Sequence, residues 1–188
     1  MSATSKNETR TRTRTRRAIL DAAVEVFGAQ PSAALADVAR AAGVSRSTVQ
    51  RYFPERTDLL RALSAYASER VDEATARVPA AESDPLVVLT RLMQEYFELG
   101  DLLMLTFSGS LPATEPEEED EETNHVLAEA VERGHREGTV DAELSAEWIE
   151  QLMWSTLFAA WNHVTEQRVP KHEALTVCLR SFGKAVRA

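Results

Sequence analysis

The stretch that decides the fold is LADVARAAGVSRSTVQRYF, residues 35–53. It begins with apolar residues at helical spacing and passes through a short Ala-Gly-Val link to a serine. A second short run follows, displays polar and basic residues, and ends before Pro54. Gly43 suits a tight turn because it has no Cβ, and Ser45 is a favourable N-cap. The pattern predicts a helix-turn-helix, whose second helix enters the major groove of DNA.

Helical spacing of apolar residues continues on both sides of this motif. Ile19, Ala23 and Phe27 predict a first helix that runs to about Phe27, preceded by a disordered tail over residues 1–9. Six more helical patterns follow Pro54, and no strand pattern competes with them. We therefore predict an all-α chain of about nine helices. A three-helix DNA-binding domain occupies residues 10–56, and a helical bundle occupies residues 57–188.

Charge is divided unevenly along the 188 residues, whose formal net charge is −9. Residues 1–61 carry a balance of +5 and residues 62–188 a balance of −14. This asymmetry argues for a nucleic-acid-binding module joined to a part that does not touch nucleic acid.

The single cysteine excludes an intramolecular disulfide and suits a reducing cytosol. With no signal peptide and no apolar run of membrane-spanning length, we expect a cytoplasmic protein without a membrane partner.

The sequence offers no catalytic or metal-binding constellation. Its four histidines do not cluster, and neither an HExxH motif nor a cysteine pair occurs. A nucleophile elbow and a phosphate-binding glycine loop are also missing. We therefore expect no enzyme activity, no cofactor and no metal site.

Residues 14–64 resemble the TetR family of bacterial transcriptional regulators. The resemblance rests on Ile19-Leu20-Asp21-Ala22-Ala23, Phe27, Asp37-Val38-Ala39, Ala41-Ala42-Gly43-Val44-Ser45, Thr48, Tyr52-Phe53-Pro54 and Asp58-Leu59-Leu60. It implies a homodimer in which a larger helical domain binds a small molecule and the bound dimer leaves its operator. Ala33 and Ala34 depart from the family, which usually has Thr or Ser there to cap the second helix. Ser32 is the alternative cap.

The expected DNA contacts lie on and beside the second helix of the motif. Arg can bond guanine and Gln can bond adenine through paired hydrogen bonds, whereas Thr48 and Tyr52 are better placed for phosphate. Arg56 resembles the family's phosphate-binding basic residue. The competing interpretation is a set of solvated polar faces. The candidates are Ser45, Arg46, Ser47, Thr48, Gln50, Arg51, Tyr52 and Arg56.

Five arginines precede the first apolar helix and admit two interpretations. They could form an arm that enters the minor groove, or a disordered basic tail that only adds electrostatic affinity. The residues are Arg10, Arg12, Arg14, Arg16 and Arg17.

The last two helices carry more apolar residues than one buried stripe needs, which indicates burial against a second subunit. The expected interface comprises Trp154, Leu157, Phe158, Trp161, Leu175, Cys178, Leu179 and Phe182.

A mostly apolar effector would be lined by flexible methionines and aromatic rings, although these residues also suit an ordinary core. The candidates are Met93, Tyr96, Phe97, Met104, Phe107, Leu152 and Thr156.

Together these features favour a ligand-responsive repressor that binds double-stranded DNA at an inverted-repeat operator as a homodimer. An activator or a ligand-independent regulator on the same fold is the first alternative. A helical enzyme or sensor with a segment that resembles a helix-turn-helix is the second.

Overall fold

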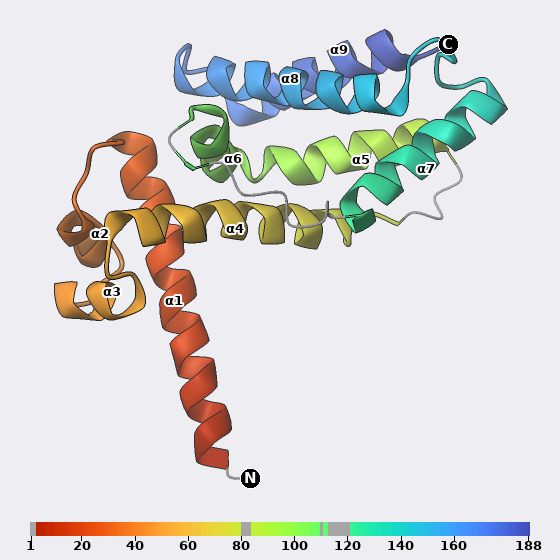
Figure 1. Cartoon of the computed structure of the whole chain (residues 1–188). Helices are drawn as coiled ribbons and strands as arrows, with labels where there is room; N and C mark the ends of the chain where they lie inside the picture. The colour runs from red at the N-terminus through yellow and green to blue at the C-terminus, as the bar shows by residue number, and fades with distance from the viewer. Residues whose placement is uncertain (1–2, 80–83, 110, 113–120) are drawn as a thin grey trace. The chain divides into compact units, whose positions relative to one another are not determined.

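The computed structural model describes residues 3–79, 84–109, 111–112 and 121–188, with side chains from residue 10 onward except at 121–124. Over these residues all the regular secondary structure is helical, joined by turns and links, apart from one isolated bridge between Val140 and Arg187 (Figure 1). The helices are α1 Ala3–Ala29, α2 Leu35–Ala41, α3 Arg46–Tyr52, α4 Arg56–Thr75, α5 Pro85–Phe97, α6 Gly100–Phe107, α7 Glu121–Glu137, α8 Ala146–Thr165 and α9 Lys171–Val186. The all-α prediction is confirmed.

The chain divides into two compact units. The first comprises residues 1–67 and 101–115, and the second comprises residues 68–100 and 116–188. The sequence placed a boundary at residue 56, whereas the first unit also includes the beginning of α4 and most of α6. The physical reason is packing, because Leu59 and Leu63 of α4 and Leu102 of α6 belong to the core of the first unit.

The core of the first unit forms where the apolar faces of α2, α3 and α4 meet α1. Ile19, Ala23 and Phe27 recur at the spacing of one helical face and are buried. Val38 of α2 and Val49 of α3 are fully buried in the same cluster. Their burial sets the rotation of each helix, so the opposite side of α3 is exposed.

The first helix is longer than the sequence indicated. It ends at Ala29, and it begins at Ala3, so residues 3–9 form helical turns where a disordered tail was expected. Within its first half, the Thr15 hydroxyl donates to the carbonyl of Thr11 at 2.9 Å. The twenty-seven residues of α1 give a length of about 40 Å.

Local chemistry sets the bounds of α2 and α3. Gly43 adopts φ +66° in the turn, a conformation that favours glycine. Ser45 caps α3, because its hydroxyl accepts from the backbone N–H of Thr48 at 3.1 Å. At the N-cap of α2, Ala34 has no polar side chain, and its own N–H donates to the Asp37 carboxylate at 3.0 Å. Asp37, and not the expected Ser32, supplies the polar group there.

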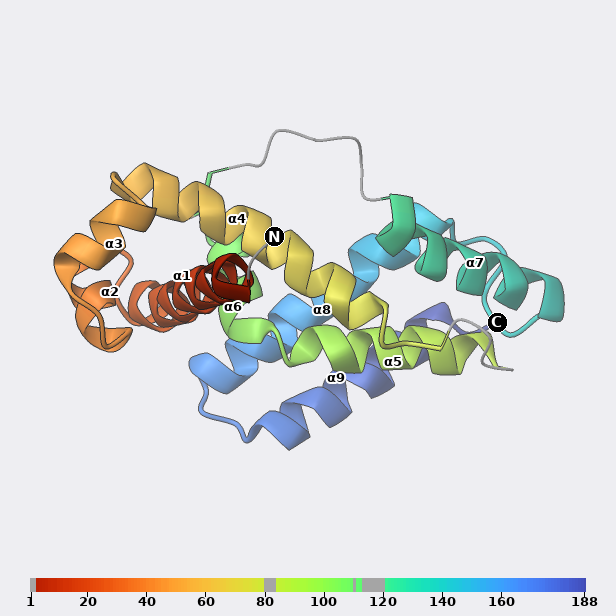
Figure 2. The ribbon, with the colours of Figure 1, turned by 90° about the horizontal axis from the view of Figure 1, so that it is seen from below.

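The second unit is built around α5, with α8 and α9 side by side next to it (Figure 2). Trp161 of α8 is buried, and its indole N–H donates to the carbonyl of Phe97 at 3.1 Å. The ring of Trp161 lies over Gly100, where an added Cβ would be 2.5 Å from the indole nitrogen. Glycine is therefore needed at this close approach.

We predict that Gly100→Ala destabilises the protein by about 1–3 kcal/mol, because the new methyl group overlaps a buried indole ring. Urea unfolding followed by circular dichroism measures the difference. Gly183→Ala is the matched control in α9, where nothing lies within 4 Å of the added Cβ. It should leave stability unchanged or raise it by about 0.5–1 kcal/mol. Equal effects of the two substitutions would contradict the role of Trp161.

Candidate DNA-binding and effector-binding sites

The exposed side of α3 carries the residues expected to read DNA. Arg46, Ser47, Gln50 and Arg51 are all exposed. Their spacing of one, four and five residues places them on one side of the helix, opposite the buried Val49. An Arg and a Gln one turn apart present the donors and acceptors that bind guanine and adenine edges in the major groove.

The beginning of α3 is organised by hydroxyl groups. The Ser45 hydroxyl lies 2.9 Å from that of Ser47 and 2.8 Å from that of Thr48. Thr48 is half-buried and participates in the cap. These bonds hold the first turn rigid and present hydroxyl groups beside Arg46, a combination suited to a phosphate group.

The end of α3 is braced by aromatic and cationic side chains. The guanidinium of Arg51 lies 5.7 Å from the centroid of the Tyr52 ring. Tyr52 and Phe53 have ring centroids 6.4 Å apart. From α1, the Arg16 guanidinium lies 5.8 Å from the Phe53 ring. Arg51 is thus oriented by its neighbour, while its side chain remains exposed.

Arg56 begins α4, as expected, and its side chain also bonds within the first unit. Its guanidinium lies 4.3 Å from the centroid of the buried Phe27 ring and donates to the carbonyls of Pro31 and Ala33. A cation stacked on an aromatic ring and bonded to two carbonyls holds the segment between α1 and α2 in place. We assign Arg56 to this structural role, because both terminal nitrogens of its guanidinium donate to carbonyls of the chain, and its contact with phosphate stays a prediction.

The seven predicted ligand residues are distributed over both units. Met104 and Phe107 belong to the first unit, and the other five belong to the second. Met93, Tyr96 and Phe97 are almost fully buried, whereas Leu152 and Thr156 are half-buried. The Thr156 hydroxyl donates to the Leu152 carbonyl at 2.6 Å.

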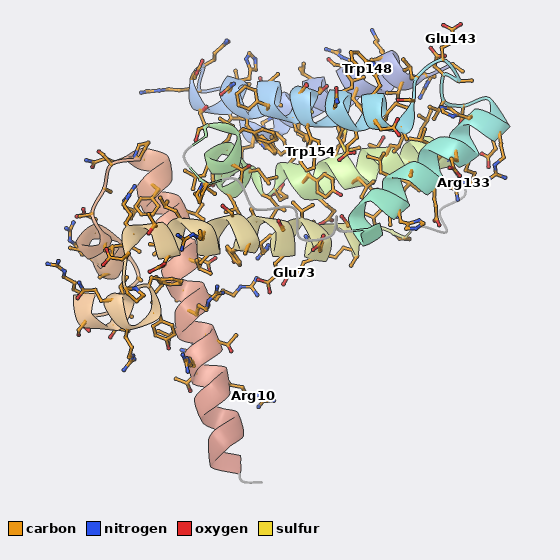
Figure 3. The ribbon with its side chains drawn as sticks, viewed as in Figure 1. Arg10, Glu73, Arg133, Glu143, Trp148 and Trp154 are labelled. Carbon is orange, nitrogen blue, oxygen red and sulfur yellow. The ribbon has the colours of Figure 1, made fainter. Side chains whose placement is uncertain are left out.

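An aromatic pair forms the most distinctive cluster of the second unit. The rings of Tyr96 and Trp154 stack with centroids 5.0 Å apart and planes 15° apart. Figure 3 shows Trp154 between α8 and α5. The Tyr96 hydroxyl lies 2.7 Å from that of Thr75, which donates to the carbonyl of Val71 at 3.0 Å. Because a hydroxyl has one proton, Tyr96 is the donor to Thr75.

Two carboxylates accompany this stack. The indole N–H of Trp154 donates to Glu150 at 3.4 Å. Burial raises the pKa of Tyr96 to about 12, and the negative charges of Glu150 and Asp72 contribute to the shift. Of the two rings only Trp154 is partly exposed, and it lies beside a carboxylate, an environment that suits a cationic aromatic group better than an anionic one. Sequence analysis missed both carboxylates. The four-residue spacing of Glu150 and Trp154 was a usable signal, whereas Asp72 comes near Tyr96 only through tertiary packing.

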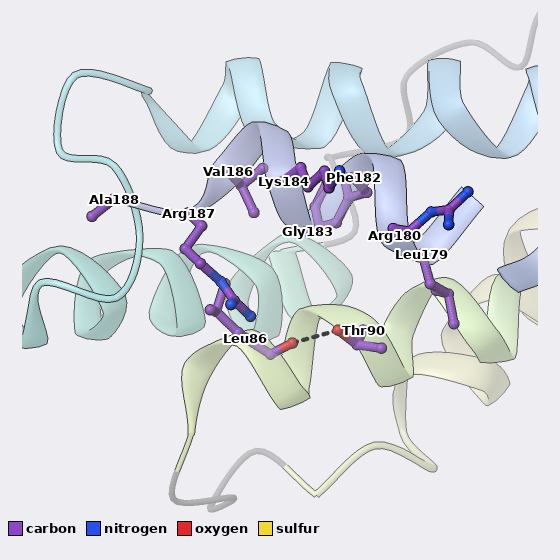
Figure 4. Close-up of a pocket in the computed structure, with 10 residues that line it drawn as sticks. All are labelled: Leu86, Thr90, Leu179, Arg180, Phe182, Gly183, Lys184, Val186, Arg187 and Ala188. Carbon is purple, nitrogen blue, oxygen red and sulfur yellow. Dashed lines mark hydrogen bonds between the residues drawn. The ribbon is translucent and has the colours of Figure 1, made fainter. Parts of the chain in front are cut away.

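A surface groove of about 540 Å³ lies between α5 and α9 (Figure 4). Leu86, Leu179 and Phe182 give it apolar walls, and the Thr90 hydroxyl donates to the Leu86 carbonyl at 2.7 Å. Its charged lining residues are all cations: Arg180, Lys184 and Arg187. The groove contains none of the seven predicted ligand residues, and its charge is opposite to that beside Tyr96.

Half of the predicted interface residues lie in the interior of the chain. Leu157, Trp161, Cys178 and Phe182 are no more than 4 % exposed. Burial raises the pKa of the Cys178 thiol to about 11, which disfavours the reactive thiolate. These four side chains fill their own subunit, so they cannot form the surface of an interface. The large apolar residues that α8 and α9 expose are Trp148, Phe158 and Val177.

The described residues contain no group of three or more potential metal ligands. Among the helices that the structure describes, none is long and apolar enough to cross a membrane.

Comparison with known proteins identifies relatives of the DNA-binding segment and of the whole chain. Residues 19–63 match the family model described as bacterial regulatory proteins, tetR family. The HTH-type transcriptional repressor LfrR of Mycolicibacterium smegmatis is 32 % identical over 178 residues, which are 92 % of this chain and 90 % of that protein.

Solved structures show the same fold. The TetR-like regulator LfrR from Mycobacterium smegmatis, crystallised in complex with proflavine, matches with a TM-score of 0.71 and 30 % identity. That match covers 92 % of this chain and 96 % of the other. A TetR family regulator from Marinobacter aquaeolei also reaches a TM-score of 0.71, at 21 % identity, over 95 % of this chain and 98 % of the other.

Arg46 and Arg56 should behave differently when each is replaced by Gln. We predict that Arg46→Gln weakens DNA binding by about 1–3 kcal/mol and leaves the melting temperature unchanged. Arg56→Gln should lower the free energy of unfolding by about 1–3 kcal/mol, because it leaves two carbonyls and a ring without their cation. Fluorescence anisotropy with DNA and thermal unfolding separate the two effects. A stable Arg56→Gln protein with weakened DNA binding would refute the structural role.

Proposed function

The chain belongs to the TetR family of bacterial regulatory proteins and is a transcriptional regulator, and from that premise we propose that it represses transcription in response to an effector. It binds an inverted-repeat operator as a homodimer in the cytoplasm, and a small organic cation releases it. The observation that carries the proposal is the exposed side of α3, where Arg46 and Gln50 stand on a capped helix held by the buried Val49.

The operator follows from the symmetry of a dimer. A two-fold pair of helix-turn-helix units reads two half-sites in opposite orientation, so the sequence bound is an inverted repeat. The basic first 61 residues attract the phosphate backbone, while the acidic remainder is repelled by it.

The proposed dimer surface is the exposed apolar part of α8 and α9. Trp148 is 56 %, Val177 45 % and Phe158 37 % exposed, an unusual exposure for large apolar side chains. Figure 3 shows Trp148 on α8. Phe158 is one of the residues that the sequence analysis put at the interface, whereas Trp148 and Val177 take the place of the four buried ones. Partner burial of this surface supplies the apolar contact that a stable homodimer requires.

The proposed effector site is the pair of Tyr96 and Trp154 with Glu150 and Asp72 beside it. A planar aromatic cation would stack on the indole and be attracted by the carboxylates. The crystallised relative LfrR binds proflavine, which is a compound of this kind. An aromatic cation therefore replaces the mostly apolar effector expected from the sequence.

Helix α4 offers a route from effector to DNA. It begins at Arg56, which holds the segment before α2, and ends at Thr75, which accepts the hydrogen bond of Tyr96. A ligand that displaces the Tyr96 ring changes a contact at one end of a helix whose other end supports the DNA-binding helices.

We predict that footprinting of the DNA upstream of the protein's own gene reveals protection of an inverted repeat. Two-fold symmetry of the dimer requires this pattern. Binding to a single asymmetric half-site alone would refute the proposal that the protein binds DNA as a homodimer. A reporter gene that rises in the presence of the protein would identify an activator instead of a repressor.

We predict that Phe158→Arg converts the dimer to a monomer, because a charge replaces an apolar side chain at the proposed interface. Sedimentation velocity measures the change. The matched control is Gln167→Arg, which adds the same charge at an exposed position after α8. A Phe158→Arg protein that remains dimeric would place the interface elsewhere.

We predict that proflavine binds this protein and that Glu150→Gln weakens binding about tenfold, because one attracting charge is lost. Trp154→Leu should weaken it at least as much. Arg180→Gln, in the groove between α5 and α9, is the control and should leave binding unchanged. Dye fluorescence titration measures all three. Stronger binding of an anionic aromatic dye, reduced by Arg180→Gln, would move the effector site to the groove.

A further inference from the structure

The part of α1 that precedes its buried stretch is a basic helix. Among the side chains of α1 that the structure describes, which begin at residue 10, Ile19 is the first that is buried, and residues 10–14 and 16–18 are exposed. We call residues 3–18 the α1 extension. Arginine alternates with threonine over much of it. In an extended chain this alternation would place the arginines on one side, whereas in a helix it distributes them around the axis.

The helix divides the five arginines into two sets. Arg12 and Arg16 are four residues apart and share one face, which we call the inner face. Arg10 and Arg14 are also four residues apart and lie on the opposite, outer face, together with Arg17. Figure 3 shows Arg10 projecting from α1 on the side away from α3.

Contacts within the first unit show which helix lies near each face of the α1 extension. Arg16 lies 5.8 Å from the ring of Phe53, which directly follows α3. Arg17 lies 5.9 Å from the ring of Tyr66 on α4. The inner face is therefore on the side of α3, and Arg12 extends it by one helical turn toward the N-terminus.

The helical form limits what the extension can contact on DNA. An α-helix with its side chains is about 10–12 Å wide, whereas the minor groove of B-DNA is about 6 Å wide. A helical extension therefore does not enter the minor groove as an extended arm does. Exposed guanidinium groups on a helix beside the groove are suited to phosphate oxygens instead.

We propose that the inner face of the α1 extension, Arg12 and Arg16, binds the DNA phosphates that flank the base pairs contacted by α3. The proposal rests on the proposed function as a DNA-binding regulator. It assigns the two arginines to positioning α3 on the duplex, with no contribution to sequence choice. The outer face, Arg10 and Arg14, contacts no phosphate and contributes only through the overall charge.

The test compares two double variants that remove the same charge from the same helix. Arg12→Gln/Arg16→Gln and Arg10→Gln/Arg14→Gln are titrated with operator DNA and with unrelated duplex at several salt concentrations. For the inner pair, the slope of log affinity against log salt should fall by about 2, on both DNAs alike. For the outer pair it should change by less than half as much. Circular dichroism checks that both variants keep their helix content.

A third variant tests the helix itself without removing charge. Thr13→Pro retains all five arginines but breaks the extension in its interior. It should weaken operator binding several-fold and lower the salt slope. Unchanged binding by this variant would overturn the assignment of the contacts to a helical face.

The remaining outcomes are equally decisive. Equal losses for the inner and outer pairs would show a diffuse basic tail, and no loss for either would show that the extension does not touch DNA. Both results would overturn the inference. The proposed function would stand in either case, provided that the wild-type protein binds operator DNA. Failure of the wild-type protein to bind any operator DNA would instead overturn the proposed function.

Discussion

The cation of Arg56 on the ring of Phe27 is the contact on which the DNA-binding unit depends. It joins the beginning of α4 to the end of α1, and its hydrogen bonds to Pro31 and Ala33 hold the link that leads into α2. Helices as short as α2 and α3 are not stable alone, so their geometry comes from the elements that they pack against. The orientation of the exposed Arg46 and Gln50 therefore depends on a contact made inside the unit, away from these two side chains.

How far the sequence predicts the structure depends on whether the information is local. The turn between α2 and α3 was predictable, because Gly43, Ser45 and Pro54 act through their own backbone or side chain. The role of Arg56 was not, since the carbonyls it binds lie 23 and 25 residues away. Ser32 failed as a cap for a related reason, because Asp37 reaches back from inside the helix and serves the same N–H group.

The apolar helices show a second limit of sequence reasoning. The surplus of apolar residues on α8 predicts burial against a second subunit, but it does not say which residues face inward. Leu157 and Trp161 pack within the chain, whereas Phe158 is exposed. Neighbours in the sequence point in different directions on a helix, so composition alone cannot separate them. The orientation is decided by tertiary contacts such as the hydrogen bond from Trp161 to Phe97.

Opposite charges keep the two proposed ligands at separate sites. DNA is a polyanion and fits the basic residues of α1 and α3, whereas an aromatic cation fits the carboxylates beside Tyr96 and Trp154. Neither ligand can occupy the site of the other, so release of DNA by the effector cannot arise from competition. It requires a difference in effector affinity between two conformations of the protein. Because α4 carries Arg56 at one end and Thr75 at the other, a change in the position of this helix is the simplest form of that difference.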